Sequence, residues 1–138
     1  MSNLNIIKID KIYTIDEVLN FYTPLKERKD YDGFLVKMNS QRYQLFKYKG
    51  CTCVKCGRVG THFRLQRHFE NKVYHFGLYS DDEIEMTKDH CIPRKHGGSD
   101  TIDNYQVMCS ECNFEKDHLL TYDDLMRGSF KSSEYNLD

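Results

Sequence analysis

Two Cys-x-x-Cys pairs constrain the folding of this 138-residue chain more than any other feature. Cys53 and Cys56 form the first pair, and Cys109 and Cys112 form the second. Two residues between thiolates let one tight turn direct both sulfurs at the same ion, and two such turns complete a tetrahedral four-cysteine zinc site. Because such a site has no open coordination position, the pattern predicts a structural Zn²⁺ ion that joins distant segments of one fold.

The remaining cysteines, Cys51 and Cys91, are expected to be thiols without a metal. Cys51 is an alternative ligand, but a Cys-x-Cys spacing suits a single tetrahedral ion less well. Cys91 alternates away from the neighbouring His90 along a predicted strand, which favours core packing. Disulfides require an oxidising compartment, and the N-terminal residues lack the basic and apolar regions of a signal peptide. We therefore expect a cytoplasmic protein.

The charge of the chain is divided between its two halves. Residues 26–76 hold twelve Lys and Arg against four Asp and Glu, whereas residues 77–138 hold six against fourteen. The basic segment could follow a phosphate backbone, although a solvated surface explains the same split equally well. Since the net charge is only −1, DNA affinity could be modest or could depend on a protein partner or a homodimer. No apolar run approaches the roughly 20 residues of a membrane helix.

Local patterns predict a mixed α+β domain without internal repeats. A capping box of Thr14 and Glu17, followed by an apolar stripe, predicts a helix over residues 15–22. Ser40 suits the N-cap of a second helix, which Gly50 ends. The other expected elements are a charged connector at 25–33, strands at 34–38, 83–91 and 105–108, a helix from Ser110, a short helix from Thr121 and a frayed end at 131–138.

The segment 61–80 alternates in a way that predicts a β-hairpin turning near residues 70–71. With that turn, Phe63 faces Leu78 and Leu65 faces Phe76, so most apolar side chains share one side. The polar side would carry His62, Arg64, Gln66, His68 and His75. Its three histidines could form a second metal cluster, although solvated surface positions are the more common outcome.

Residues 86–116 gather residue types that carry chemistry. Asp89 and His90 end a predicted strand, Asn104 follows a loop that a Gly-Gly pair allows to double back, and Asn113 lies in the helix begun by the second cysteine pair. Consecutive strand residues point to opposite sides, so Asp89 and His90 share a site only if the strand bends there. With such a bend, four polar groups would converge on a frame held by zinc.

The stretch "KDHCIPRKHGGSDTIDNYQVMCSECNFEK" resembles the HNH endonuclease family, with the order DH, IP, GG, N and CxxCNxxK. Upstream, "LFKYKGCTCVKCG" resembles the lead-in helix and first zinc knuckle of the same family. The resemblance covers residues 40–116, with the hairpin as a less typical insertion. It implies a ββα-metal fold and the hydrolysis of DNA phosphodiester bonds.

The resemblance also assigns roles to residues. His90 matches the general base, and Asn104 matches the central asparagine that orients the loop and the base. Asn113 stands where the last histidine of the family name is expected, which makes this an HNN variant, and Asp89 would share a catalytic Mg²⁺ or Mn²⁺ ion with it. On chemical grounds, carboxylate and amide oxygens suit these ions, and a neutral imidazole accepts a proton near neutral pH.

Three further residues are candidate contacts to the DNA backbone. Arg94 and His96 lie in the predicted loop, and Lys116 lies in the last predicted helix. The alternative is that they are solvated loop and surface residues without a specific role.

Together these features predict an HNH nuclease core at residues 40–120, a helical N-terminal extension at 1–39 packed on the core, and a C-terminal tail at 121–138. The expected protein is a metal-dependent endonuclease that nicks or cuts double-stranded DNA. Because asparagine stands in the third position, two alternatives stay open: a catalytically weak or inactive DNA-binding module stabilised by zinc, and a protein-interaction adaptor. Similar small proteins occur in phages and mobile elements, which indicates a bacterial or phage-infected host cell.

Overall fold

The computed structural model describes residues 5–119 and shows an α+β fold with two antiparallel sheets. In chain order its elements are β1 (Ile6–Tyr13), α1 (Ile15–Leu19), β2 (Arg28–Tyr31), β3 (Phe34–Lys37), α2 (Gln41–Lys49), β4 (Gly60–His68), β5 (His75–Ser80), β6 (Glu85–His90), the 3-10 turns η2 (Arg94–His96) and η3 (Ile102–Asn104), β7 (Tyr105–Cys109) and α3 (Ser110–Leu119). The helix predicted from Thr121 and the frayed end at 131–138 lie outside the described residues.

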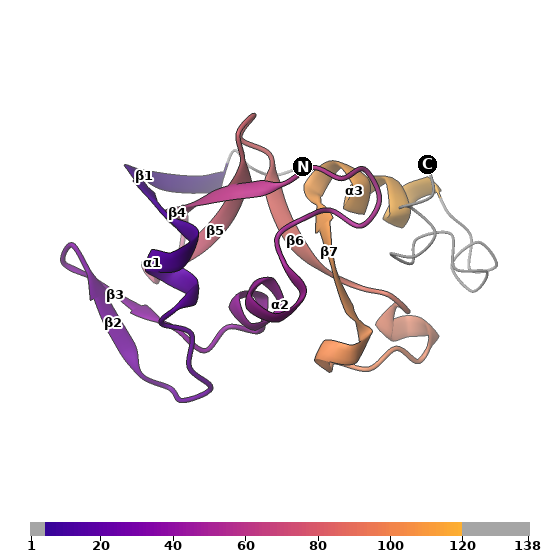
Figure 1. Ribbon diagram of the computed structural model, residues 1–138, viewed down its shortest axis with the longest axis horizontal. Coiled ribbons are helices and arrows are strands. Elements are labelled where there is room, and N and C mark those ends of the chain that lie inside the picture. Colours follow the sequence, from indigo (N-terminus) through magenta and orange to yellow (C-terminus); the bar gives the residue numbers. More distant parts are fainter. Residues whose placement is uncertain (1–4, 120–138) are drawn as a thin grey trace.

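The larger sheet has the strand order β1-β4-β5-β6-β7, and β2 pairs with β3 in a separate hairpin. Pairing between β6 and β7 covers five residue pairs, whereas β5 and β6 share only two, Leu78 with Met86 and Tyr79 with Glu85. In Figure 1, α2 and α3 lie on opposite sides of the β6–β7 pair. The last two strands and α3 therefore form a ββα unit at one edge of the sheet.

Both predicted N-terminal helices are confirmed, with one difference in length. Thr14 accepts a hydrogen bond from the backbone N–H of Glu17 at 3.1 Å, and Glu17 accepts one from Thr14 N–H at 2.8 Å, so the capping box is complete. Helix α1 ends at Leu19 instead of residue 22. Helix α2 has the predicted bounds, because Ser40 accepts from Arg42 N–H at 3.1 Å and Gly50 ends the helix with a φ of 92°.

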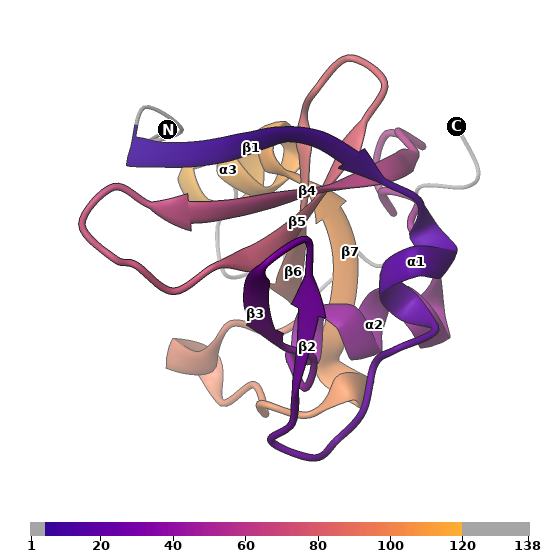
Figure 2. The same cartoon turned by 90° about the vertical axis from the view of Figure 1, so that its left-hand side faces the viewer.

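The N-terminal extension is mostly strand, which corrects the prediction of a helical extension. Strand β1 pairs with β4, for example Tyr13 with Phe63, and forms the outer strand of the large sheet (Figure 2). The connector predicted at residues 25–33 is also wrong from Arg28 onward, because Arg28–Tyr31 forms β2. Asp32 and Gly33 turn the chain between β2 and β3 with φ values of 55° and 97°. An Asp-Gly pair between two strands is a strong hairpin signal.

The predicted register of the second hairpin is confirmed. Phe63 pairs with Leu78, and Leu65 pairs with Phe76. The turn is longer than two residues, because pairing between β4 and β5 ends at Gln66 and His75. The expected polar side is partly buried: Gln66 is 1% exposed and accepts a hydrogen bond from the Tyr79 hydroxyl at 2.5 Å.

Aromatic rings fill the core between the large sheet, α2 and the β2–β3 hairpin. Phe76 lies at its centre and makes an edge contact with Tyr31, with ring centroids 4.7 Å apart. Its backbone N–H donates to the Tyr43 hydroxyl at 2.8 Å, so this buried hydroxyl has a hydrogen-bond partner. Within residues 5–119, no helix is long and apolar enough to cross a membrane.

Candidate active site and metal centre

Four thiols meet where the loop before β4 approaches the start of α3. The sulfur atoms of Cys53, Cys56, Cys109 and Cys112 all lie within 4.8 Å of one another. The Cys56 and Cys109 sulfurs are 3.8 Å apart. Tetrahedral Zn–S bonds of about 2.3 Å place sulfurs about 3.8 Å apart, so this set has the dimensions of a zinc site.

Local hydrogen bonds hold the two halves of the cluster together. Gly57 has a φ of 81° and donates its backbone N–H to Cys53 O at 3.1 Å, which closes the first turn. Val54 N–H donates to Val107 O at 2.9 Å and ties that turn to β7. The second pair spans the end of β7 and the first turn of α3. Zinc at this position would therefore link the loop after α2 to the ββα unit.

Burial and mutual proximity disfavour the thiolate forms of Cys109 and Cys112. A hydrogen bond with Cys53, together with burial, raises the pKa of Cys109 to about 12. Burial and the neighbouring Cys109 raise the pKa of Cys112 to about 12. Arg58 Nη1 donates to Cys109 Sγ at 3.3 Å and brings one positive charge. Four thiolates at this spacing need a metal ion to be stable together.

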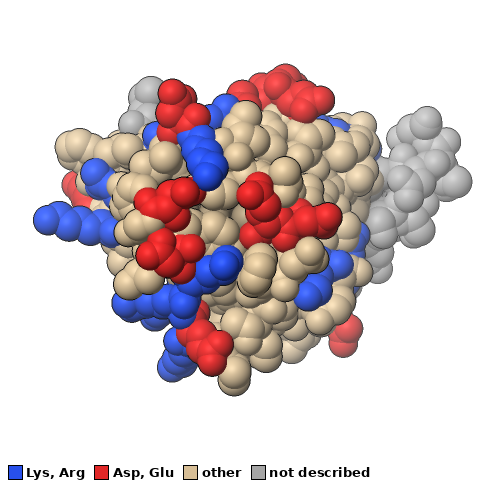
Figure 3. All heavy atoms as spheres, turned by 60° about the vertical axis from the view of Figure 1, so that its left-hand side comes forward, with Lys and Arg blue, Asp and Glu red and all other residues tan. Residues whose placement is uncertain are grey.

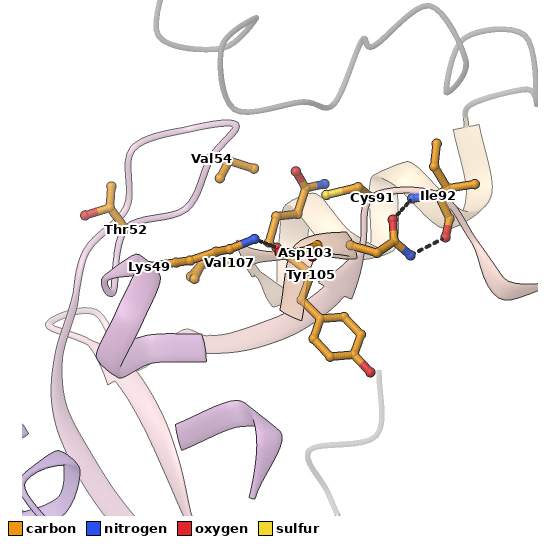
Figure 4. Close-up of a pocket in the computed structure, with 10 residues that line it drawn as sticks. Lys49, Thr52, Val54, Cys91, Ile92, Asp103, Tyr105 and Val107 are labelled. Carbon is orange, nitrogen blue, oxygen red and sulfur yellow. Dashed lines mark hydrogen bonds between the residues drawn. The ribbon is translucent and has the colours of Figure 1, made fainter. Parts of the chain in front are cut away.

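The other two thiols lie outside the cluster. Cys51 is half-buried, and burial raises its pKa. Cys91 is also half-buried and lines a cavity of about 680 Å³, so its expected packing in the core is wrong. Figure 4 shows this cavity, with Lys49 extending from α2 toward β7. The Lys49 ammonium donates to the carbonyls of Ile102 and Tyr105, at 2.7 Å each.

A smaller cavity, of about 270 Å³, lies between β6, η2 and α3. Three of the four predicted catalytic residues line it, namely Asp89, His90 and Asn113. Asn104 is not among the residues that line this cavity. We define the smaller cavity as the candidate active site.

Strand β6 does not bend at the Asp-His pair. Asp89 pairs with Gln106 and His90 pairs with Tyr105 in regular antiparallel register. Asp89 therefore faces α3, whereas His90 faces the opposite side of the sheet. The two side chains reach the cavity from opposite sides at the end of β6. A bend is thus unnecessary for both of them to line it.

Asp89 is the buried centre of the α3 side. Its Oδ2 accepts from the Lys116 ammonium at 2.6 Å and from Gln106 Nε2 at 2.9 Å. Burial raises the pKa of Asp89, and the Lys116 ammonium opposes that shift. Lys116 also donates to the carbonyls of His90 and Cys91. This arrangement leaves Oδ1 as the carboxylate oxygen that Asp89 can offer to a metal ion.

Asn113 approaches from the first half of α3. Its Nδ2 donates to Thr87 Oγ1 at 2.8 Å, and Thr87 Oγ1 donates to Met108 O at 2.7 Å. Because the amide nitrogen is engaged with Thr87, the amide oxygen is the atom left to act as a ligand. Asp89 and Asn113 thus offer one carboxylate and one amide oxygen on the same side of β6, a donor set that suits Mg²⁺ or Mn²⁺ with additional waters.

His90 is held by residues that sequence reasoning missed. Its Nε2 lies 2.8 Å from Asp100 Oδ1, and its ring packs edge-on against Tyr105 with centroids 5.0 Å apart. Asp100 could have been proposed from the sequence, because it is a carboxylate that closely follows the Gly-Gly pair. A second missed residue, Gln106, lies in the strand predicted at residues 105–108 and donates to Asp89.

Asn104 organises the loop between β6 and β7 from within. Its Oδ1 accepts from Ile92 N–H at 3.0 Å, and its Nδ2 donates to Ile92 O at 3.0 Å and to Ser99 O at 2.9 Å. The side chain therefore replaces the missing strand pairing across this loop. Gly97 has a φ of 91°, which favours glycine.

Replacing Gly98 by alanine is expected to disrupt this loop. The added Cβ would lie 1.7 Å from Ile92 O and 2.8 Å from Asn104 Nδ2, so the backbone must move. We expect a loss of about 1–3 kcal/mol in unfolding free energy, measured by urea denaturation. Gly33→Ala in the β2–β3 turn is the control, because its Cβ meets nothing within 4 Å and only its φ of 97° is strained. A larger loss in Gly33→Ala than in Gly98→Ala would contradict the crowding at Ile92.

The three candidate DNA contacts differ in exposure. Arg94 has a side chain 72% exposed, lines the candidate active site and donates to Asp100 at 2.9 Å. His96 is half-buried in η2. Lys116 has a side chain only 2% exposed, so its expected contact with a DNA backbone is wrong for this structure. Its charge instead neutralises Asp89.

The structure also tests two broader predictions, a second metal cluster and the separation of charge along the chain. Within residues 5–119, the four cysteines are the only group of three or more Cys, His, Asp or Glu side chains placed to share one ion, so the histidines of β4 and β5 are not brought together as a second cluster of this kind. His62 instead contacts Glu83, at 2.9 Å. On the face shown in Figure 3, acidic and basic side chains are intermixed, so the two charge blocks of the sequence do not form separate surfaces there.

An antiparallel strand pair followed by a helix, joined to a four-thiol cluster, is the architecture of an HNH-type core. Residues 78–119 match the family model described as HNH endonuclease. The match confirms the resemblance for that segment, which contains β6, β7, α3 and the second cysteine pair. Comparison with curated proteins and with solved structures gave no match.

Proposed function

We propose that this protein is a metal-dependent endonuclease that hydrolyses phosphodiester bonds in double-stranded DNA. The observation that carries the proposal is the shared cavity of Asp89, His90 and Asn113, within a segment that matches the HNH endonuclease family. These residues supply a base and two oxygen ligands. A cavity open to solvent at this point suits an extended polymer whose scissile phosphate enters from outside.

The chain's own residues provide most of the chemistry. The His90 imidazole takes a proton from the attacking water, and Arg94 at the mouth of the cavity offers a guanidinium to the phosphate. Asp89 and Asn113 would hold a Mg²⁺ or Mn²⁺ ion, which would supply charge neutralisation at the phosphate and stabilisation of the leaving oxygen. The products would be a 5′-phosphate and a 3′-hydroxyl. Asn104 acts on the loop and not on the substrate.

The four-cysteine cluster is proposed to hold one structural Zn²⁺ ion that does no chemistry. Its role is to fix the start of α3, from which Asn113 and Lys116 project. None of the six cysteines forms a disulfide, and a reducing compartment such as the cytoplasm keeps thiolate ligands available. The net charge of −1 indicates modest DNA affinity, so a protein partner or a homodimer would extend the DNA contact.

Plasmid nicking tests the proposal. Supercoiled plasmid incubated with the zinc-loaded protein and Mg²⁺ or Mn²⁺ is expected to be nicked or linearised, and EDTA should stop the reaction. His90→Ala should lower the rate by at least about 100-fold, the usual contribution of a general base. His68→Ala is the control, because His68 is an exposed histidine on β4, away from the cavity. Equal rates for wild type and His90→Ala would overturn the assignment of the base.

One observation favours the alternative of a catalytically weak DNA-binding module. The Lys116 ammonium donates to Oδ2 of the Asp89 carboxylate, the group that would hold the metal ion. If this pair persists on DNA, the protein would bind plasmid with a salt-dependent affinity and leave it supercoiled. Gel shifts run beside the nicking assay separate this outcome from a protein-interaction adaptor, which would not bind DNA.

A further inference from the structure

The loop that closes the candidate active site brings one carboxylate to the proposed base. Asp100 Oδ1 lies 2.8 Å from His90 Nε2, and Arg94 Nε donates to the same oxygen at 2.9 Å. A carboxylate only accepts hydrogen bonds, so Nε2 must carry a proton in this contact. In the neutral imidazole, the lone pair is then on Nδ1.

The position of Asp100 is itself fixed by elements outside its own turn. Its backbone carbonyl accepts from Gln41 Nε2 at 3.2 Å, and the preceding carbonyl, of Ser99, accepts from Asn104 Nδ2 at 2.9 Å. Gln41 begins α2 and also accepts, through Oε1, from Tyr105 OH at 3.1 Å. The residue that holds Asp100 and the ring that packs on His90 therefore belong to one hydrogen-bonded group.

We propose that Asp100 is a positioning residue that holds His90 as the Nε2–H tautomer, with Nδ1 as the nitrogen that accepts a proton from water. This inference rests on the proposed function. The ring is oriented from two directions, by Asp100 at Nε2 and by the edge contact with Tyr105. An imidazole held in this way needs no reorientation before proton transfer, which is the advantage that a fixed orienting group gives a histidine base.

The charged groups around His90 agree with this assignment. Lys88 lies over the Tyr105 ring, 4.2 Å from its centroid, and donates to Gln41 at 3.0 Å. Lys116 contacts the backbone carbonyl of His90 and not its ring. Within residues 5–119, Asp100 is therefore the carboxylate in contact with the imidazole, since Asp89 is engaged by Lys116 on the other side of β6.

Nuclear magnetic resonance tests the tautomer without any assay of activity. In zinc-loaded, ¹⁵N-labelled protein at a pH where the imidazole is neutral, the His90 Nε2 proton is expected to be visible and shifted downfield, because the Asp100 carboxylate protects it. Asp100→Ala should abolish this signal through exchange with water. Asp103→Ala, which removes another exposed carboxylate of the same loop, should leave it unchanged. A protonated Nδ1 in wild type, or an unchanged signal in Asp100→Ala, would overturn the proposal.

Kinetics add a second readout. Asp100→Ala should lower kcat for plasmid nicking by about 10–100-fold, with little change in KM or in the thermal midpoint, because Asp100 is exposed and makes no core contact. Asp100→Asn, whose amide oxygen still accepts a hydrogen bond, should retain part of that activity. Full activity in Asp100→Ala would overturn the positioning role. If wild type does not nick plasmid, the proposed function fails, and the resonance experiment still decides whether Asp100 holds His90.

Discussion

Replacing Cys109 by serine is expected to remove the zinc ion and to unfold the ββα unit. Cys109 ends β7 and is fully buried. Its sulfur lies 3.8 Å from the Cys56 sulfur and accepts from Arg58 Nη1 at 3.3 Å. Structural zinc sites contribute about 10–16 kcal/mol of binding free energy, which equals or exceeds the whole stability of a typical domain, about 5–15 kcal/mol. Hydrogen bonds to Asn113 and Lys116 alone would not hold α3 in place.

The measurements are zinc content by elemental analysis and thermal unfolding followed by circular dichroism. Wild type should contain about one zinc ion per chain, and Cys109→Ser should contain almost none and lose its cooperative transition. Cys51→Ser is the matched control, since Cys51 is a half-buried thiol outside the cluster. Loss of zinc from Cys51→Ser would show that the ligand set is wrong. Retention of zinc by Cys109→Ser would contradict the four-thiol site.

Replacing Lys116 by methionine is expected to destabilise the protein by about 3–5 kcal/mol, because it leaves the buried Asp89 carboxylate without its counter-charge. Both side chains of the pair are buried, at 2% and 7% exposure, and their atoms are 2.6 Å apart. Methionine preserves most of the volume of lysine, so the loss reports the charge. The carbonyls of His90 and Cys91 would lose their donor as well.

The pH dependence of this variant has a definite sign. Burial raises the pKa of Asp89, and removal of the ammonium that opposes the shift would raise it further. A folded-state pKa above the unfolded value means that the folded protein binds the proton more tightly, so stability falls as pH rises through the folded pKa. Lys116→Met should therefore lose more stability at pH 8 than at pH 5.

Urea denaturation at the two pH values, in zinc-loaded protein without Mg²⁺, measures this effect. Lys11→Met is the control, because the Lys11–Asp32 pair has side chains 51% and 54% exposed, and an exposed pair contributes less than about 1 kcal/mol. Equal losses in the two variants would show that the Asp89–Lys116 pair does not stabilise the fold.

Features set by neighbouring residues could be predicted from the sequence. The bounds of α2 follow from Ser40 and Gly50, and the register of β4 with β5 follows from the alternation around Phe63. The meeting of the two cysteine pairs was also predictable, because their spacing suits one ion. In each case the residues that decide the structure carry a specific chemical or conformational preference.

Features set by distant partners could not be predicted. Strand β1 pairs with β4 across fifty or more residues, and its short apolar alternation does not identify that partner. Lys116 reads as a surface lysine until α3 is placed on β6, where Asp89 is already buried. The contact of Asp100 with His90 likewise depends on the path of the loop between β6 and β7. Asn104 fixes that path through its hydrogen bonds with Ile92 and Ser99.

The narrow pairing of β5 with β6 bears on how such a protein can change over time. The segment that matches the nuclease family begins at Leu78, one of the two β5 residues that pair with β6. The strands before that point could lengthen, shorten or be exchanged while only two residue pairs are disturbed. The N-terminal strands can thus diverge to suit a new host or target. The ββα unit, in contrast, must be inherited together with α2 and the loop that carries Cys53 and Cys56, because these segments contact its loop and complete its four-thiol cluster.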